Sequence, residues 1–247
     1  MNAYPVSNSY VSAQKRANLT KLLLIVGIAI GVLSILSLLL ELAFPPFADD
    51  QEIGDNPAAF VVLLLQMGVG IIQFLVYVAT IVVFCMWLHR SYRNLPALGA
   101  RNIAYSPGWA VGSFFVPFVN LIIPYRAVKE LWEKSLQGPS YFTTDSPGAI
   151  FPLWWLFWLL GNFLSNACFR VSMHEGTTRD TIVIVCGIAD VLTIAAAIFA
   201  IAVVTAITKR QEESSKSMNL GQPTQWPVPP PPTTFEAPQP AGGQTSP

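Results

Sequence analysis

The sequence predicts an all-α fold, a polytopic membrane helical bundle. Of its 247 residues, 53% are hydrophobic and 11% are charged, whereas about a quarter of the residues in a soluble domain are charged. The hydrophobic residues also gather in long runs, each close to or above the roughly 20 residues that a membrane-spanning helix needs. We therefore expect four full transmembrane helices, at residues 22–44, 58–88, 151–169 and 181–207.

Basic residues set the expected orientation of these spans. Three lie before the first run, four acidic residues and no basic one follow it, and three arginines follow the second run. Because lysine and arginine concentrate on the cytoplasmic side, we expect a cytoplasmic N-terminus. The first run exceeds the apolar core of a signal peptide, about 7–15 residues, so we expect it to be retained. Residues 1–18 are expected to be disordered, and residues 19–210 to form the transmembrane domain.

The apolar segment 109–124 is the unusual part of the chain. As a helix, its residues would rise about 24 Å, short of a hydrocarbon core of about 30 Å. Pro117 interrupts it and Pro124 ends it, and a proline inside a helix removes a backbone hydrogen bond. If the segment does not cross, twelve of the fourteen Lys and Arg residues are cytoplasmic; if it crosses, only eight are. We expect a re-entrant or half-buried hairpin, with a tilted fifth span as the alternative.

Residues 125–136 follow with an amphipathic pattern. Val128, Leu131, Trp132 and Ser135 share one face at helical spacing. The pattern predicts a helix lying in the headgroup plane with Trp132 as its anchor, or else an ordinary solvated helix end.

The end of the chain, residues 211–247, has a different composition. Nine of the twenty prolines fall within residues 222–247. Few apolar residues remain to build a core, so we expect a disordered tail with polyproline II character. Such a tail can dock in an aromatic-lined groove of a partner domain, or serve only as a spacer.

Two sequence blocks resemble a known family. The first is WLHRSYRNLPALG directly after the second span, and the second contains SPGWAV, VPFVNLIIP and ELW. Their order and spacing resemble the bacterial membrane family named domain of unknown function 4328, over about residues 20–210. The family has no established activity, substrate or cofactor, so the resemblance implies only a multi-span protein of the bacterial inner membrane. The matching positions are Arg93, Asn94, Leu95, Trp109, Pro117, Asn120, Pro124 and Glu130.

Polar residues within the runs are candidates for intramembrane sites. Glu41 lies near the outer end of its run, whereas Asp190 lies about 13 Å deep by helical rise. A charge at membrane depth is unfavourable by about 2.5–3.5 kcal/mol or more, so Asp190 should face the bundle interior. Asn162 and Gln66 fall at similar depth and are its expected partners. Polar contact between helices is one interpretation, and a proton or cation site is the other.

Basic residues beyond the second span are candidates for lipid contact. Arg90, Arg93 and Arg101 follow that span, and Arg126 and Lys129 are expected nearby. Such a group can bind anionic headgroups, or it can reflect topology alone. Arg93 could instead form an ion pair with Glu130, joining the two sequence blocks.

Other features limit the classes of function. The cysteines, Cys85, Cys168 and Cys186, are odd in number and form no CxxC pair, so we expect neither a disulfide framework nor a zinc site, and we interpret them as small buried residues without a disulfide. His89 and His174 fall on opposite sides of the membrane in the four-span topology, and no catalytic motif is present. Zero net charge argues against nucleic acid. No cofactor is expected.

These features support three hypotheses of function. The first is a non-enzymatic structural or interaction component of the bacterial inner membrane. Its partners would be the lipid bilayer, other membrane proteins and a groove-type domain that binds the Pro-rich tail. The second is a small transporter or channel subunit that uses segment 109–124 and Asp190. The third and weakest is a lipid-modifying enzyme. Oligomeric state is not predicted.

Overall fold

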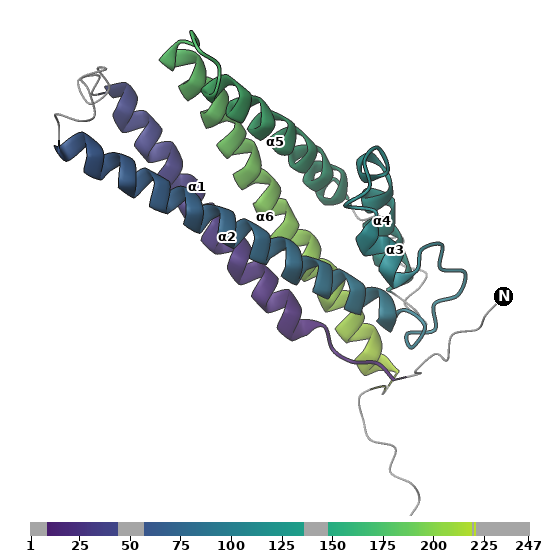
Figure 1. The fold of residues 1–247 in the computed structure, drawn as a ribbon. Coiled ribbons are helices and arrows are strands. Elements are labelled where there is room, and N and C mark those ends of the chain that lie inside the picture. The colour runs from purple at the N-terminus through teal and green to yellow at the C-terminus, as the bar shows by residue number, and fades with distance from the viewer. Residues whose placement is uncertain (1–8, 44–56, 136–147, 219, 221–247) are drawn as a thin grey trace, which may run out of the picture.

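The computed structural model describes residues 9–43, 57–135, 148–218 and 220. Every regular element in these ranges is a helix (Figure 1). The long helices are α1 (Gln14–Ala43), α2 (Pro57–Asn94), α5 (Ile150–Ser172) and α6 (Arg179–Ser217). Between α2 and α5 lie α3 (Pro107–Gly112), the 3-10 helix η2 (Val119–Leu121) and α4 (Ile123–Lys134).

Three of the long helices contain segments long and apolar enough to cross a membrane. These segments are Gln14–Leu39, Gly68–Asn94 and Asp180–Ser217. The helix α5 has 23 residues, but its tryptophans and asparagines lower its mean hydropathy. The all-helical fold is thus confirmed together with three candidate spans, and the fourth span stays a prediction.

Helix α6 has the central place in the bundle. It packs against α1 and against α5, and α2 packs against α1 (Figure 1). A glycine permits a close approach of α5 to α6, since a Cβ atom at Gly161 would lie 3.4 Å from the backbone nitrogen of Thr193. The short elements α3 and α4 lie beside the end of the bundle where α2 ends and α5 begins (Figure 1).

Buried apolar side chains gather at that same end, which we call the packed end. They come from the start of α1, the end of α2, α3, α4, the start of α5 and the end of α6. The rest of the long helices, the open half, exposes large apolar side chains; Phe163 of α5 is 74% exposed. The largest fully buried side chains of the packed end include Trp87, Leu88, Tyr92, Leu95, Val128, Leu131, Phe151, Val203, Val204 and Ile207.

Two boundaries of predicted disorder are wrong. Helix α1 already begins at Gln14, and Ala13 and Ala17 are buried, so residues 14–18 are ordered. Helix α6 continues to Ser217, past the expected end of the domain at residue 210. In both places packing against the packed end orders residues that lack an apolar run of their own. The prediction for residues 222–247 lies outside the described residues.

The segment 109–124 does not form one continuous helix. Helix α3 contains six residues and ends at Gly112; turns and η2 then lead to α4. Six helical residues rise only about 9 Å, so α3 alone is far too short to cross a bilayer. Entry of the segment into the membrane stays a prediction.

Candidate functional site

The connection between α3 and α4, which includes η2, presents aromatic side chains to the surroundings. In this apolar loop, residues 113–122, Phe118 is 85% exposed and Phe115 is also exposed. The backbone nitrogen of Val119 donates to the carbonyl oxygen of Pro117 at 2.8 Å, and Phe118 between them has φ 63° and ψ −41°. This is the geometry of a γ-turn of the rare, strained kind, which costs on the order of 1–3 kcal/mol. Such strain at an exposed aromatic residue suggests a functional constraint.

An aromatic cluster holds this loop in place. The indole nitrogen of Trp155 donates to the carbonyl oxygen of Leu121 at 3.0 Å. The ring of Phe114 meets Trp155 and Trp158 edge to face, and Phe84 of α2 also contacts it. The tryptophans at the start of α5 therefore bind the apolar loop and α2 together.

Four of the family-motif positions lie in the apolar loop or beside it. Ser106 caps α3 by accepting a hydrogen bond from the backbone nitrogen of Trp109. Pro117 is exposed in the strained turn, and Pro124 is buried in the first turn of α4. The side-chain oxygen of Asn120 is buried and has no hydrogen-bond partner among the described residues.

Glu130 joins α4 to the end of α2. Its carboxylate accepts a hydrogen bond from the backbone nitrogen of Ala104 at 2.6 Å, and the Tyr92 hydroxyl donates to it at 3.2 Å. The predicted ion pair between Arg93 and Glu130 is wrong for these described residues. Neighbouring residues on a helix point about 100° apart, so Tyr92 faces α4 whereas Arg93 is exposed.

Asn94 fastens the segment that precedes α1. Its buried side-chain amide donates to the carbonyl oxygen of Val11 at 3.0 Å and accepts from the Val11 nitrogen at 3.4 Å. The adjacent Tyr10 hydroxyl donates to the Glu212 carboxylate at 2.9 Å, and Ser12 also donates to it. Burial and this carboxylate raise the pKa of Tyr10, so the phenol stays a donor. Residues 10–13 thus form an N-terminal strap at the packed end, where Leu95 is also buried.

Buried polar groups of α6 complete the packed end. Gln211 donates to the Ser91 carbonyl oxygen at 3.0 Å and to the Ser135 hydroxyl at 3.1 Å. Ser214 donates to the Ser135 carbonyl oxygen at 2.8 Å, and the Trp87 indole donates to Thr208 at 3.0 Å. Sequence reasoning missed this network, although residues 208 and 211 recur at helical spacing.

The predicted role of Trp132 as an interfacial anchor stays a prediction, and its ring also has partners within the protein. Its ring packs against Phe151, and the Arg210 guanidinium lies 4.2 Å from the ring centroid. Neighbouring Ala127, Val128 and Leu131 are fully buried, so α4 packs into the protein.

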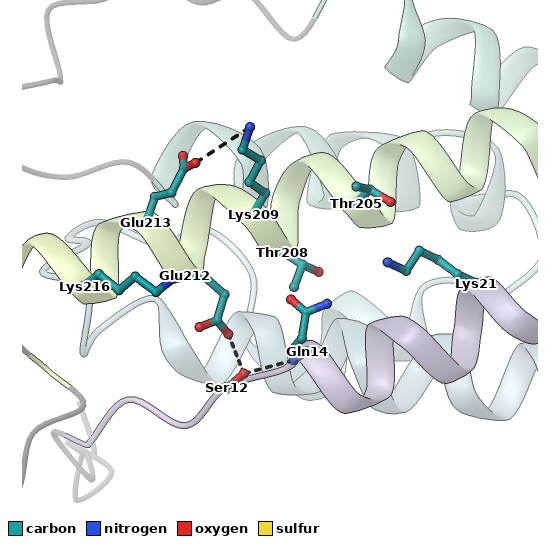
Figure 2. Close-up of a pocket in the computed structure, with 9 residues that line it drawn as sticks. All are labelled: Ser12, Gln14, Lys21, Thr205, Thr208, Lys209, Glu212, Glu213 and Lys216. Atoms are coloured by element: carbon teal, nitrogen blue, oxygen red, sulfur yellow. Dashed lines mark hydrogen bonds and ion pairs between the residues drawn. The ribbon is translucent and has the colours of Figure 1, made fainter.

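A polar groove of about 480 Å³ lies between the start of α1 and the end of α6. Figure 2 shows Lys21 extending towards Thr205 and Thr208 across it. Lys209 and Glu213 form an ion pair at 3.8 Å on one rim, but both side chains are mostly exposed, so the pair adds little stability. With cations and carboxylates mixed, the groove favours neither sign of ligand strongly. The described residues contain no group of His, Cys, Asp and Glu that could hold a metal ion.

Asp190 makes a different contact from the one expected. It accepts a hydrogen bond from the Ser34 hydroxyl at 2.8 Å, across the α1–α6 interface. Asn162 instead donates to the Trp158 carbonyl oxygen at 2.7 Å. Asp190 lies about 20 Å along α6 from the buried Val203, so the structure does not bring it together with the apolar loop. The predictions for Glu41 and Gln66 concern side chains outside the described part of the structure.

The expectation of no disulfide is wrong. Cys168 of α5 is bonded to Cys186 of α6, near the ends of these helices that lie away from the packed end. Cys85 is free. Antiparallel packing of α5 and α6 brings the two thiols together, which an odd count and the lack of a CxxC motif could not reveal.

The predicted basic residues do not all lie together. Arg90 and Arg93 are charged neighbours, joined by Arg16, which sequence reasoning did not single out. The other three lie outside this neighbourhood. The carbonyl oxygen of Arg101 accepts a hydrogen bond from Lys134, and Lys129 forms an ion pair with Glu133 at 3.8 Å. Arg126 is exposed on α4.

These features define a class: an all-helical, membrane-associated protein with a short, broken helical element beside one end of the bundle. Within that class, the chain belongs to the family described as domain of unknown function (DUF4328), whose model matches residues 54–209. The match covers the chain from just before α2 almost to the end of α6. No curated protein and no solved structure matches the chain.

Proposed function

We propose that this protein is a non-enzymatic interaction component of the bacterial inner membrane. The observation that carries the proposal is the uneven packing of the bundle. Burial and hydrogen bonding between helices concentrate at the packed end, where Asn94 and Glu130 of the family motif have their contacts. The open half presents apolar side chains suited to lipid. The packed end would form a rigid platform for other membrane components, and the Pro-rich tail would extend from it.

The proposal includes four spans with both termini in the cytoplasm. The 23 residues of α5 rise about 34 Å, enough for a hydrocarbon core of about 30 Å. Arginines and lysines gather at the packed end, as expected for the cytoplasmic side. The Cys168–Cys186 bond lies towards the other end, and disulfides persist in oxidising compartments outside the cytoplasm.

The transporter alternative has less support. It requires Asp190 and the broken segment 109–124 to share a pathway, but they lie at different levels of the bundle. The polar groove also lies at the packed end rather than at Asp190. Hydrogen bonding to Ser34 accounts for Asp190 as a contact between helices.

Thiol labelling of intact cells tests the topology. In a Cys85→Ser background, whose remaining cysteines are disulfide-bonded, we expect His174→Cys to react with a membrane-impermeant reagent. Lys129→Cys should react only after the membrane is opened. Labelling of Lys129→Cys in intact cells would overturn the four-span topology.

Cross-linked pull-downs test the interaction role. The full chain should retain specific membrane or cytoplasmic proteins, and a chain ending at residue 221 should lose those that bind the tail. Recovery no different from that of an unrelated four-span protein would contradict the proposal.

A further inference from the structure

Four basic side chains meet where the start of α1 lies beside the end of α2. The Arg16 guanidinium donates to the carbonyl oxygen of Met86 at 3.2 Å. In an α-helix this carbonyl faces the residue four positions on, which is Arg90. His89 and Arg93 are also four positions apart and therefore neighbours on the helix surface. We call Arg16, His89, Arg90 and Arg93 the basic patch.

Among the described residues, no carboxylate acts electrostatically on His89 or Arg90 of this patch. Arg16 and Arg93 both act electrostatically on His89 and on Arg90, and the other group that acts on Arg90 is the Tyr10 phenol. The Glu212 carboxylate accepts hydrogen bonds from Tyr10 and Ser12, and it is not among the groups that act electrostatically on His89 or Arg90. Like charges held together this way repel one another, so the site favours an anion.

Backbone contacts fix two of the guanidinium groups. Arg90 donates through Nε to the carbonyl oxygen of Val11 at 3.1 Å, and Arg16 donates through Nη1 to Met86. Each guanidinium has five N–H donors in a planar fork, so most donors stay available to a ligand. Arg93 is exposed beside them.

The surroundings of the patch indicate which anion fits. The patch lies just beyond the most apolar part of α2, where the span would meet the headgroups in the four-span topology of the proposed function. On the membrane side of it, Leu19 and Leu22 of α1 and Val82 and Met86 of α2 expose apolar surface. Cations above an apolar surface match a phospholipid, with its phosphate on the patch and its acyl chains below.

We propose that the basic patch binds the phosphate headgroup of an anionic phospholipid in the cytoplasmic leaflet. Guanidinium groups pair with phosphate oxygens through two parallel hydrogen bonds. Because each basic residue near the surface contributes about 1 kcal/mol to such binding, loss of one should weaken it about fivefold. This site differs from the predicted one by including Arg16 and His89 and by omitting Arg101, Arg126 and Lys129.

Native mass spectrometry of the full chain, titrated with phosphatidylglycerol or phosphatidylcholine, tests this site. Phosphatidylglycerol should bind more tightly, Arg93→Gln should weaken it about fivefold, and Arg16→Gln with Arg93→Gln should weaken it further. The control Arg126→Gln removes the same charge from an exposed position on α4 and should leave binding unchanged. Unfolding temperatures should show that each variant is folded.

Three results would overturn the proposal. Equal weakening by Arg126→Gln would show attraction by net charge alone. Unchanged binding in the double variant would place the lipid elsewhere. Displacement of the lipid by inorganic phosphate at equal concentration would show a site for free phosphate, without a contribution from the acyl chains.

Discussion

At the packed end, apolar and polar side chains are both buried, whereas in the open half the large apolar side chains point outward. Leu131 is fully buried at the first, and Leu75 is 60% exposed in the second. Water drives apolar surface together, but lipid tails are as apolar as leucine and give no such drive between helices. The tight packing therefore marks the region that must exclude water, and the open half is complete only with lipid around it.

The largest expected effect contrasts these two leucines. Leu131→Ala leaves a cavity in the packed end and should lower the free energy of unfolding by about 2–5 kcal/mol. Leu75→Ala removes the same atoms from an exposed position and should change it by less than about 0.5 kcal/mol. Unfolding in mild detergent, followed by tryptophan fluorescence, measures both. Equal effects would show that the two regions do not differ in packing energy.

A smaller effect is expected from the polar contacts of the packed end. Glu130→Ala removes the acceptor of the exposed Ala104 nitrogen and of the partly buried Tyr92 hydroxyl, and hydrogen bonds to charged groups contribute about 1.5–3 kcal/mol. Glu133→Ala breaks only an exposed pair and should change the free energy of unfolding by less than about 1 kcal/mol. The same unfolding experiment compares them.

Charge reversal sharpens that prediction. If Glu130 acts through Ala104 and Tyr92, then Arg93→Glu should not rescue Glu130→Arg. Recovery of stability in the double variant would contradict this prediction, because it would show that residues 93 and 130 interact as an ion pair.

The smallest effect is expected in the open half. Asp190→Asn keeps an oxygen that can accept from Ser34, and interhelical hydrogen bonds average about 0.6 kcal/mol. We expect thermal stability and expression to change little. A pronounced loss of either would show that the charge of Asp190, rather than its acceptor oxygen, holds α1 to α6.

The sequence predicted the long helices well because apolar runs indicate membrane helices directly. It did not predict the contacts at either end of the bundle, because these contacts join residues that are far apart in the sequence. Gln211 lies 120 residues from Ser91 and 76 from Ser135, and no local pattern announces such contacts. The same holds for Cys168 and Cys186, whose pairing depends on how α5 and α6 align.

For the candidate site, the sequence identifies several of the residues but not the groups that they contact. Asn94 and Glu130 were singled out, but their partners are backbone groups of Val11 and Ala104, and any residue type supplies such groups. From the sequence, Arg16 contributes only to the expected orientation of the spans. Its position beside Arg90 depends on how α1 packs against α2, which the sequence does not show.

The polar network of α6 also has a consequence for biosynthesis. Thr208, Gln211 and Ser214 are translated after every residue of the aromatic cluster and after α4. Until they emerge, the Trp87 indole lacks its acceptor and the Ser135 carbonyl lacks its donor. During synthesis, the packed end therefore cannot complete its hydrogen bonds until the end of α6 has been translated. In a chain truncated within α6, these buried polar groups would stay exposed to water.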